Sequence, residues 1–393
     1  MTQTKKYKRI LVSSASVGSG HNSAAKALIE QIKNQSPDTE VQFIDAMEYC
    51  SKWFRKWYAD GFNLSMSRLP KLYALGYVFT SKPPVPKKWA GENRLFLTER
   101  FVLKRYADFV CEYQPDLVLH THFVAPAVIS RLCRKGKISA RQQVVVTDII
   151  PHRWWTAPDM DCYYVSQPES KDELIRWGVD ASRVKISGIP VHPKWIQNQP
   201  GRAELCKRWD LPADKKIVLL AGGVEFTCGP ILKIAQQIAA QNSNACVVVL
   251  TGRNQQLFDK LAELPHAKAG SIVPMGYTTK LPELAEIAEL MITKPGGLTT
   301  AECLAKSIPM LFLKPVFGQE GNNAKIITAR GGGVIARSTK EVIARAGELL
   351  SDADKLLEMS RSAGKMYRPG TQSIVENILG TDSRVLTSNA NCD

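Results

Sequence analysis

Residues 289–302, ELMITKPGGLTTAE, decide the fold class of this 393-residue chain. An apolar run at 289–293 turns at Pro295-Gly296-Gly297 and continues into a helix-like pattern that reaches Glu302. A strand that passes through a glycine turn directly into a helix is the repeating unit of parallel α/β sheets. The segment therefore predicts an α/β fold at the centre of the second half of the chain.

The same turn predicts a seat for a diphosphate. Glycines allow backbone N–H groups to approach a ligand closely, and the start of a helix offers unpaired donors at the positive end of its dipole. Glu302 lies one turn into the helix, where a carboxylate could accept hydrogen bonds from ribose hydroxyls. The alternative is a plain helix entry, in which the glycines only turn the chain and the glutamate is a capping residue. The turn alone leaves both interpretations open.

Strand-like runs alternate with helix-like segments along nearly the whole chain, which predicts two doubly wound domains. The expected strands of the first domain are 8–14, 40–45, 116–120, 143–147, 162–165 and 184–187. Those of the second domain are 215–221, 245–251, 270–273, 289–293, 309–312 and 332–335. The expected divisions are a first domain at 1–188, a proline-rich linker at 189–200, a second domain at 201–365, a C-terminal helix at 366–380 that packs back on the first domain, and a tail at 381–393.

Composition restricts the class of protein. The chain is 44% hydrophobic and 23% charged, and no run approaches the ~18 to 20 apolar residues of a membrane-spanning helix. The N-terminus has no secretory pattern, and the nine cysteines form no CxxC pair, so we expect a cytoplasmic protein with reduced thiols and no zinc site.

The formal net charge of +15 favours an anionic partner, and residues 51–105 hold twelve Lys/Arg against three Asp/Glu. This stretch lies in a predicted insertion at 47–113 and is also rich in aromatic residues, a combination typical of a peripheral membrane surface. The expected membrane contacts are Lys52, Trp53, Arg55, Lys56 and Trp57. The alternatives are that the rings pack in the core or that the segment binds single-stranded nucleic acid, although no nucleic-acid motif accompanies it.

Two further strand ends of the second domain carry glycines, at Gly222-Gly223 and at Gly252-Arg253. Ligands of open α/β sheets bind at the carboxyl ends of strands, so Arg253 is a candidate partner of the diphosphate, or else a solvated surface arginine. Gln319 and Glu320, after the strand at 309–312, offer amide and carboxylate groups suited to sugar hydroxyls, or else cap a helix.

The first strand leads into a second glycine loop, Gly18-Ser19-Gly20, followed by His21. One interpretation is an NAD-binding loop, with Asp45 as the ribose acid, although Ser23 occupies the third glycine position. The other is a histidine at a helix N-terminus, where the dipole disfavours imidazolium and keeps the ring available as a base.

Two more strand ends of the first domain should meet His21 at the same edge of the sheet. One carries His120-Thr121-His122, which has no third ligand at a metal-binding spacing. The other carries Asp148, which could orient a histidine, stabilise charge or cap a turn.

The motifs together resemble the bacterial processive diacylglycerol glucosyltransferases and the plant monogalactosyldiacylglycerol synthases. The resemblance spans about residues 7–380 and rests on the order GSGHNSAAKAL, VVTDIIPHRWW, KISGIPVHPKW, GGV, TGRN, TKPGGLTTAE and FGQEGNN. It implies a GT-B fold, two Rossmann-like domains facing across a cleft. It also implies transfer of a hexose from a UDP-sugar to diacylglycerol or glycosyl-diacylglycerol, with inversion and without a metal. We expect no cofactor, no nucleic-acid partner and a peripheral location on the cytoplasmic face of the membrane.

By position, the resemblance makes His21 the base and Glu302 the ribose-binding acid. It places Gly276 and Tyr277 near uracil and Gln319 and Glu320 near the hexose. It assigns the diphosphate seat to Gly296, Gly297, Leu298, Thr299 and Thr300. Acceptor binding falls to Gly18, Ser19, Gly20, His152 and Trp154. Ser19 stands where the plant enzymes usually have a glycine, so the acceptor loop differs. A more distant similarity to the lipid II-forming N-acetylglucosaminyl transferase leaves open a UDP-GlcNAc donor with a polyprenyl-linked acceptor. An NAD-dependent enzyme and a non-catalytic lipid-binding module are also left open.

Overall fold

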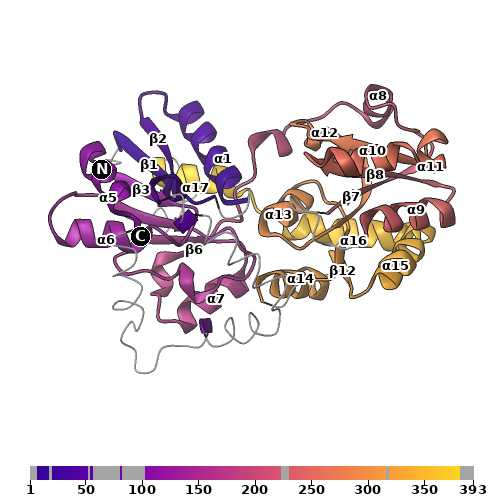
Figure 1. Ribbon diagram of the computed structural model, residues 1–393. Helices are drawn as coiled ribbons and strands as arrows, with labels where there is room; N and C mark the ends of the chain where they lie inside the picture. The colour runs from indigo at the N-terminus through magenta and orange to yellow at the C-terminus, as the bar shows by residue number, and fades with distance from the viewer. Residues whose placement is uncertain are drawn as a thin grey trace, which may run out of the picture. The chain divides into compact units, whose positions relative to one another are not determined.

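A computed structural model describes residues 7–16, 20–51, 54–55, 80–81, 102–222, 230–315 and 318–380. The chain forms two compact units, which Figure 1 shows in ribbon form. The first unit combines Met1–Pro193 with the returning segment Arg368–Asp393, and the second is Lys194–Tyr367. The expected linker 189–200 is thus divided between the two units.

The first unit is built on a parallel sheet with the strand order β2-β1-β3-β4-β5-β6. Its strands are β1 (Arg9–Ser14), β2 (Glu40–Asp45), β3 (Leu117–His120), β4 (Arg141–Val145), β5 (Cys162–Val165) and β6 (Val184–Ile186). All six lie where the sequence predicts a strand, although β4 begins and ends two residues earlier than expected.

Helices cover both faces of this sheet because successive strand side chains point to opposite faces and both sets are apolar. The helices are α1 (Gly20–Gln35), α5 (Lys104–Tyr113), α6 (Pro126–Arg134), α7 (Pro168–Arg176) and α17 (Gly370–Leu379), with short 3-10 turns η1 (Ala46–Tyr49), η2 (Arg153–Trp155), η3 (Ala181–Arg183) and η4 (Pro193–Trp195). Val12 packs in one cluster with residues of α1 and α17, whereas Leu11 packs in another with residues of α5 and α6. Figure 1 shows α17, in yellow, beside α1.

The ends of the predicted insertion belong to the core of the first unit. Met47, Tyr106 and Val110 are buried together with strand residues, and Phe54 packs against the same cluster. Within the predicted insertion 47–113, η1 and α5 therefore supply core surface for the sheet. Of the expected membrane contacts, Arg55 is exposed, while Lys52, Trp53, Lys56 and Trp57 lie outside the described residues.

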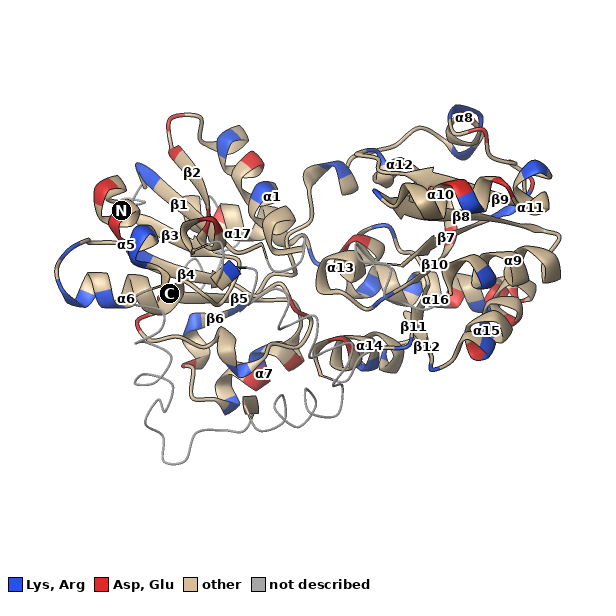
Figure 2. Cartoon of the chain, viewed as in Figure 1, with Lys and Arg blue, Asp and Glu red and all other residues tan. Residues whose placement is uncertain are grey.

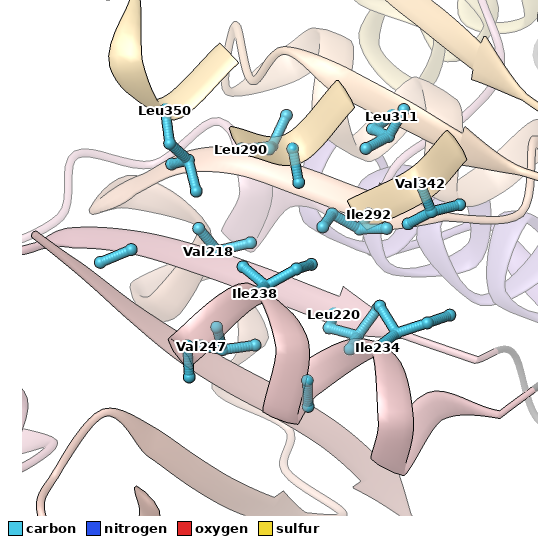
Figure 3. Packing of buried hydrophobic residues seen from close by; sticks show 14 of the residues in the cluster. Val218, Leu220, Ile234, Ile238, Val247, Leu290, Ile292, Leu311, Val342 and Leu350 are labelled. Carbon is cyan, nitrogen blue, oxygen red and sulfur yellow. The ribbon is translucent and has the colours of Figure 1, made fainter. Parts of the chain in front are cut away.

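The second unit repeats the architecture with the strand order β12-β11-β10-β7-β8-β9, all parallel. Its strands are β7 (Lys216–Ala221), β8 (Ala245–Gly252), β9 (Ile272–Gly276), β10 (Ala288–Thr293), β11 (Met310–Leu313) and β12 (Gly333–Ala336), each close to its predicted position. Its helices are α8 (Arg202–Arg208), α9 (Ile231–Gln241), α10 (Gln255–Ala262), α11 (Pro265–Lys268), α12 (Leu281–Glu286), α13 (Gly297–Ala305), α14 (Gln319–Ala329), α15 (Thr339–Ser351) and α16 (Ala353–Met366). Figure 3 shows Val218 and Leu220 of β7 packed with Ile234 and Ile238 of α9.

Each strand order reverses direction once, and this reversal positions the candidate sites. In the first sheet the direction changes between β1 and β3, and in the second between β7 and β10. In open α/β sheets, ligands bind beside the carboxyl ends of the strands that flank such a switch point. His21 follows β1, and the glycine turn at residues 295–297 follows β10, so each predicted motif lies at the switch point of its own sheet.

Candidate active site

His21 is held by two groups from neighbouring strands of the first sheet. Its Nδ1 lies 3.0 Å from the Thr121 carbonyl oxygen after β3 and 2.7 Å from Thr147 Oγ1 after β4. A carbonyl oxygen can only accept, so Nδ1 carries the proton and donates it. Nε2 is then an unprotonated acceptor, and it has no hydrogen-bond partner within the described ranges.

The ring of His21 is neutral at physiological pH. Burial lowers its pKa to about 4, because removal from water disfavours the charged form, and the hydrogen bond to Thr121 opposes this shift only in part. The position at the start of α1 acts in the same direction, since the N-terminal end of the helix dipole disfavours a cation. His21 therefore presents a neutral base, as a proton acceptor in transfer chemistry requires.

Aromatic rings surround His21 on the side of β3 and β4. The His122 ring lies edge-to-face with a centroid distance of 4.5 Å, and the fully buried Trp155 ring lies 6.0 Å away. Asp148 accepts a 2.8 Å hydrogen bond from Trp155 Nε1. The His21 ring itself is fixed by Thr121 and Thr147. That Asp148 orients a histidine or stabilises charge stays a prediction.

The predicted acceptor residues lie around the same strand ends. Gly20 begins α1, and Gly18 and Ser19 lie outside the described residues. His152 is buried, and its Nε2 lies 3.1 Å from Thr80 Oγ1, so a residue of the predicted insertion contacts the loop after β4. The Trp154 side chain is 44% exposed and packs on Phe123 at 5.5 Å between centroids.

In the second unit, the turn after β10 leaves open space at the start of α13. Gly296 is the N-cap residue, with φ −67° and ψ 142°, a conformation that any residue adopts, and a side chain there would meet nothing within 4 Å. Turning and packing therefore do not require glycine at this position. The first intrahelical bond is donated by Thr300 N to the Gly296 carbonyl, so the N–H groups of Gly297, Leu298 and Thr299 are left for a ligand.

Glu302 projects from α13 five residues after Gly297. Burial raises the pKa of its carboxyl to about 8. Strong perturbation of an acid near a ligand seat is typical of functional sites. On the same helix, the Thr300 hydroxyl is buried and has no partner among the described residues.

The loop before α13 is tied to the start of α14. The buried Asn323 donates a 2.9 Å hydrogen bond from Nδ2 to the Pro295 carbonyl. Lys294 Nζ lies 3.9 Å from Glu320 Oε1, and Gln319 is the first residue of the helix. The predicted hexose-reading residues thus lie next to the predicted diphosphate seat, one strand along the sheet.

The remaining predicted donor residues lie on the other side of the switch point. Gly222 is buried at the end of β7, and Gly223 lies outside the described residues. The Arg253 guanidinium lies over the Tyr277 ring, 5.4 Å from its centroid, beyond β8 and β9, and Gly276 ends β9. Arg253 therefore contacts the predicted uracil residue Tyr277 in this structure, and its pairing with a diphosphate stays a prediction.

Comparisons with known proteins assign both units. The family model described as monogalactosyldiacylglycerol (MGDG) synthase matches residues 21–191, and the glycosyltransferase family 28 C-terminal domain matches residues 217–375. The chain is 27% identical over 390 residues to a processive diacylglycerol beta-glucosyltransferase of Bacillus subtilis, covering 97% of each chain. A protein of the same description from Staphylococcus aureus strain MRSA252 is 29% identical over 394 residues, covering 96% of this chain and 93% of that one.

Over nearly its whole length the chain is similar to the processive diacylglycerol beta-glucosyltransferases, and its two halves match the monogalactosyldiacylglycerol synthase and family 28 C-terminal models. It is therefore a UDP-sugar-dependent glycosyltransferase. Its fold is similar to the crystal structure of Acinetobacter baumannii MurG, with a TM-score of 0.60 at 14% identity, covering 95% of this chain and 99% of that chain. The predicted GT-B fold class, with two Rossmann-like domains, is confirmed.

The assignment as a glycosyltransferase replaces the NAD-dependent alternative, and the structure shows what Asp45 contacts. Asp45 Oδ1 accepts hydrogen bonds from the backbone N–H groups of Ser16 and Met47, and Oδ2 accepts one from Asn22 Nδ2. The carboxylate of the supposed ribose acid is thus engaged in tying β2 to the loop after β1. Among the described residues of the glycosyltransferase, no three His, Cys, Asp or Glu side chains gather as a metal site would require.

Several residues that shape these sites were missed by sequence reasoning. Thr121 acts through its backbone carbonyl, which has no sequence signature, and Thr147 acts from a strand end 126 positions from His21. Asn323 of the glycosyltransferase was predicted only as part of a polar helix start, whereas it fixes the Pro295 carbonyl. Only the order of strands in the sheet brings such residues together.

Proposed function

We propose that this glycosyltransferase moves a hexose from a UDP-sugar to the hydroxyl of diacylglycerol or glycosyl-diacylglycerol, with inversion and without a metal ion. The observation that carries the proposal is the open space over Gly296 at the start of α13, at the switch point of the second sheet. It gives a diphosphate access to three unpaired N–H groups and to the positive end of the helix dipole. The diacylglycerol acceptor rests on the family and on the names of its relatives.

In the proposed reaction the first unit supplies the base. Nε2 of His21 takes the proton of the acceptor hydroxyl, and the hydroxyl oxygen forms a bond to the anomeric carbon. The bond between that carbon and the β-phosphate oxygen breaks, and UDP leaves with the electron pair. A single displacement of this kind inverts the anomeric carbon. The N–H groups at Gly297, Leu298 and Thr299 stabilise the charge that develops on the diphosphate.

The residues of the donor site have separable tasks in this proposal. Glu302 accepts hydrogen bonds from the ribose hydroxyls, Gln319 and Glu320 bind the hexose, and Gly276 and Tyr277 lie near the uracil. Gly222, Gly223 and Arg253 complete the surroundings of the diphosphate. In the first unit, Gly18, Ser19, Gly20, His152 and Trp154 bind the acceptor, and Asp148 stabilises charge near the base.

A product assay tests the reaction. The full chain is incubated with diacylglycerol in mixed micelles and, separately, with UDP-glucose, UDP-galactose and UDP-N-acetylglucosamine, and the lipids are identified by mass spectrometry. We expect a hexosyl-diacylglycerol and stoichiometric release of UDP. A product only with a polyprenyl-linked acceptor would replace the lipid assignment, and no UDP release with any pair would favour a non-catalytic lipid-binding module.

His21→Ala should lower turnover by about 10²-fold or more while leaving the affinity for UDP nearly unchanged. The reason is that the imidazole acts on the acceptor proton and belongs to the unit that does not hold the nucleotide. Turnover is measured by UDP release and affinity by calorimetry. Loss of UDP binding in this variant would contradict the role.

We further propose that the protein acts at an anionic membrane surface through the basic aromatic segment at 51–105. None of the helices in the described part of the chain is both long and apolar enough to cross a bilayer. Figure 2 shows Lys and Arg mixed with Asp and Glu on α15, whereas the last turn of α6 carries Arg131 and Arg134 without an acidic neighbour in that helix.

Replacing the predicted contacts should weaken binding to vesicles. A variant with Trp53→Ala, Lys52→Glu and Lys56→Glu is compared with the wild-type chain by sedimentation with vesicles that contain acidic lipid. Each cation near such a surface contributes about 1 kcal/mol, so the loss should be at least tenfold at low salt. Equal sedimentation of the two proteins would show that the segment does not act at the membrane.

A further inference from the structure

His122 lies directly against the base and has no role in the reaction described above. It follows β3, is 3% exposed, and its ring meets the His21 ring edge-to-face at 80° with 4.5 Å between centroids. Two other rings enclose the pair, because Phe123 lies 4.1 Å from His122 and Trp155 lies 6.3 Å from it.

The tautomer of His122 is set by the turn that contains it. Its Nδ1 accepts a 3.2 Å hydrogen bond from the backbone N–H of Val124, so its proton is on Nε2. His21 holds its proton on Nδ1, so the two neighbouring rings have opposite tautomers. No hydrogen bond joins the rings within the described part of the chain, and their contact is one of packing.

The two histidines do not gain protons equally. Burial holds the pKa of His122 well below its ordinary value, and the charge of a protonated His21 lowers it further. When His21 accepts a proton, His122 therefore stays neutral. Two carboxylates at the ends of strands in this sheet have other partners, since Asp148 accepts from Trp155 Nε1 and Asp45 accepts from Asn22 Nδ2.

We propose that His122 is a positioning residue for His21: its neutral ring fixes the His21 imidazole and excludes water from it, so that Nε2 is presented unprotonated and in one orientation. The proposal rests on the proposed function of His21 as the base. In this proposal His122 supplies a packing surface beside the His21 ring, whereas Thr121 and Thr147 hold that ring by hydrogen bonds.

A purely structural role for His122 would act through Val124 instead. Two substitutions separate these roles. His122→Asn keeps a side-chain oxygen that can accept from the Val124 N–H but removes the ring. His122→Phe keeps a ring of similar width but removes the acceptor. His120→Asn is the matched control, since His120 is equally buried on the same chain segment and contacts Gln142 rather than His21.

The first measurement is an NMR titration of labelled histidines in the full chain, which gives the pKa of His21. In the wild-type protein we expect His21 to titrate below pH 5 and His122 below His21. We expect His122→Asn to raise the pKa of His21 by about one unit or more, because water then reaches the ring. His122→Phe and His120→Asn should leave this pKa within about 0.3 units.

The second measurement is the pH profile of kcat/KM. With His122→Asn, kcat should fall about tenfold and the acid limb should shift to higher pH, while KM for the UDP-sugar stays constant. An equal effect of His122→Phe, an unshifted His21 in His122→Asn, or a reversed order of titration in the wild-type protein would overturn the proposal. Absence of transferase activity in the wild-type protein would contradict the proposed function alone, because the NMR titration does not depend on turnover.

Discussion

Glu302 shows how a single carboxyl links the stability of the protein to its ligand. Its pKa is raised from the ordinary value of 4.5 to about 8 by burial, so the folded protein holds a proton that the unfolded chain releases. The stabilising effect of this proton is complete below pH 4.5 and is lost as the pH rises through 8. Ribose hydroxyls that donate to the ionised carboxylate would recover part of that loss.

Glu302→Gln should therefore remove a pH dependence of unfolding. We expect the free energy of unfolding of the variant to match that of the wild-type protein near pH 4.5 and to exceed it by about 2 kcal/mol or more at pH 9. Urea unfolding of the second unit at pH 5, 7 and 9 measures this difference. The control is Glu263→Gln, which removes an exposed carboxylate of the same unit. A constant difference across these pH values would mean that Glu302 is hydrated in the folded protein.

The pH dependence of UDP binding should give an independent measure of the ionisation of Glu302. If the bound ribose favours the ionised form, UDP affinity increases with pH between about 6 and 8, and binding releases a proton at pH 7. Calorimetry in two buffers of different ionisation enthalpy detects that proton. Proton uptake on binding would show that Glu302 acts in its protonated form.

At the scale of elements, two helices of the second unit begin in the same way but only one begins at a switch point. Gly296 before α13 and Gly201 before α8 are both N-cap residues, with φ of −67° and −64°, and a side chain at either position would meet nothing within 4 Å. Only α13 follows β10, which flanks the reversal of strand order. Substitutions at these two glycines therefore distinguish the loss of stability at a helix N-cap from the loss of a ligand-binding site.

Gly296→Val should leave the unit folded and reduce UDP affinity by at least about tenfold, because the side chain occupies the space that a diphosphate needs. Gly201→Val should cost a similar small amount of stability, since valine is a poorer N-cap than glycine, and should not change UDP binding. Thermal unfolding and calorimetric titration with UDP are measured for both variants. Unchanged affinity in Gly296→Val would place the nucleotide elsewhere.

At the scale of the whole molecule, the first unit is completed by the last helix of the chain. Ile374, Val375 and Ile378 of α17 are buried with residues of α1 and β1, and Tyr164 donates a 2.7 Å hydrogen bond to Asn377. The family 28 match ends at residue 375, inside this helix, although α17 packs in the other unit. The boundary between the units therefore crosses the chain twice, at residues 193–194 and 367–368.

The chain segments next to these two crossings pack closely, because Gly188 and Gly370 have no side chains to hold them apart. A Cβ atom on Gly370 would meet the Gly188 and Ile189 carbonyl oxygens at 2.7 Å, and Thr371 donates a 2.6 Å hydrogen bond to the Val191 carbonyl. Backbone atoms cannot move aside as side chains do. Gly188 also has a φ of +96°, which favours glycine on its own account.

Gly370→Ala should destabilise the first unit by about 1–3 kcal/mol through overpacking. Gly347→Ala is the matched control in α15: its Cβ would be 3.8 Å from Asn242 Oδ1, an ordinary contact, and alanine should stabilise that helix by about 0.5–1 kcal/mol. Differential scanning calorimetry of both variants measures these two changes in stability, which should have opposite signs. Equal stability of Gly370→Ala and the wild-type protein would mean that the crossing can widen.

The sequence by itself determined the class of fold, the twelve strands and the glycine turn after β10, because these depend on local patterns of apolar residues and glycine. Through the order of the motifs it also supplied candidate residues for the site, whose roles stay predictions. Only the tertiary structure decided what those residues contact. It showed that Thr121 and Thr147 rather than Asp148 hold His21, that η1 and α5 belong to the core, and that Asp45 closes a loop. These contacts join strand ends far apart in the chain, and their geometry follows from the order of strands in the sheet, which local sequence patterns do not encode.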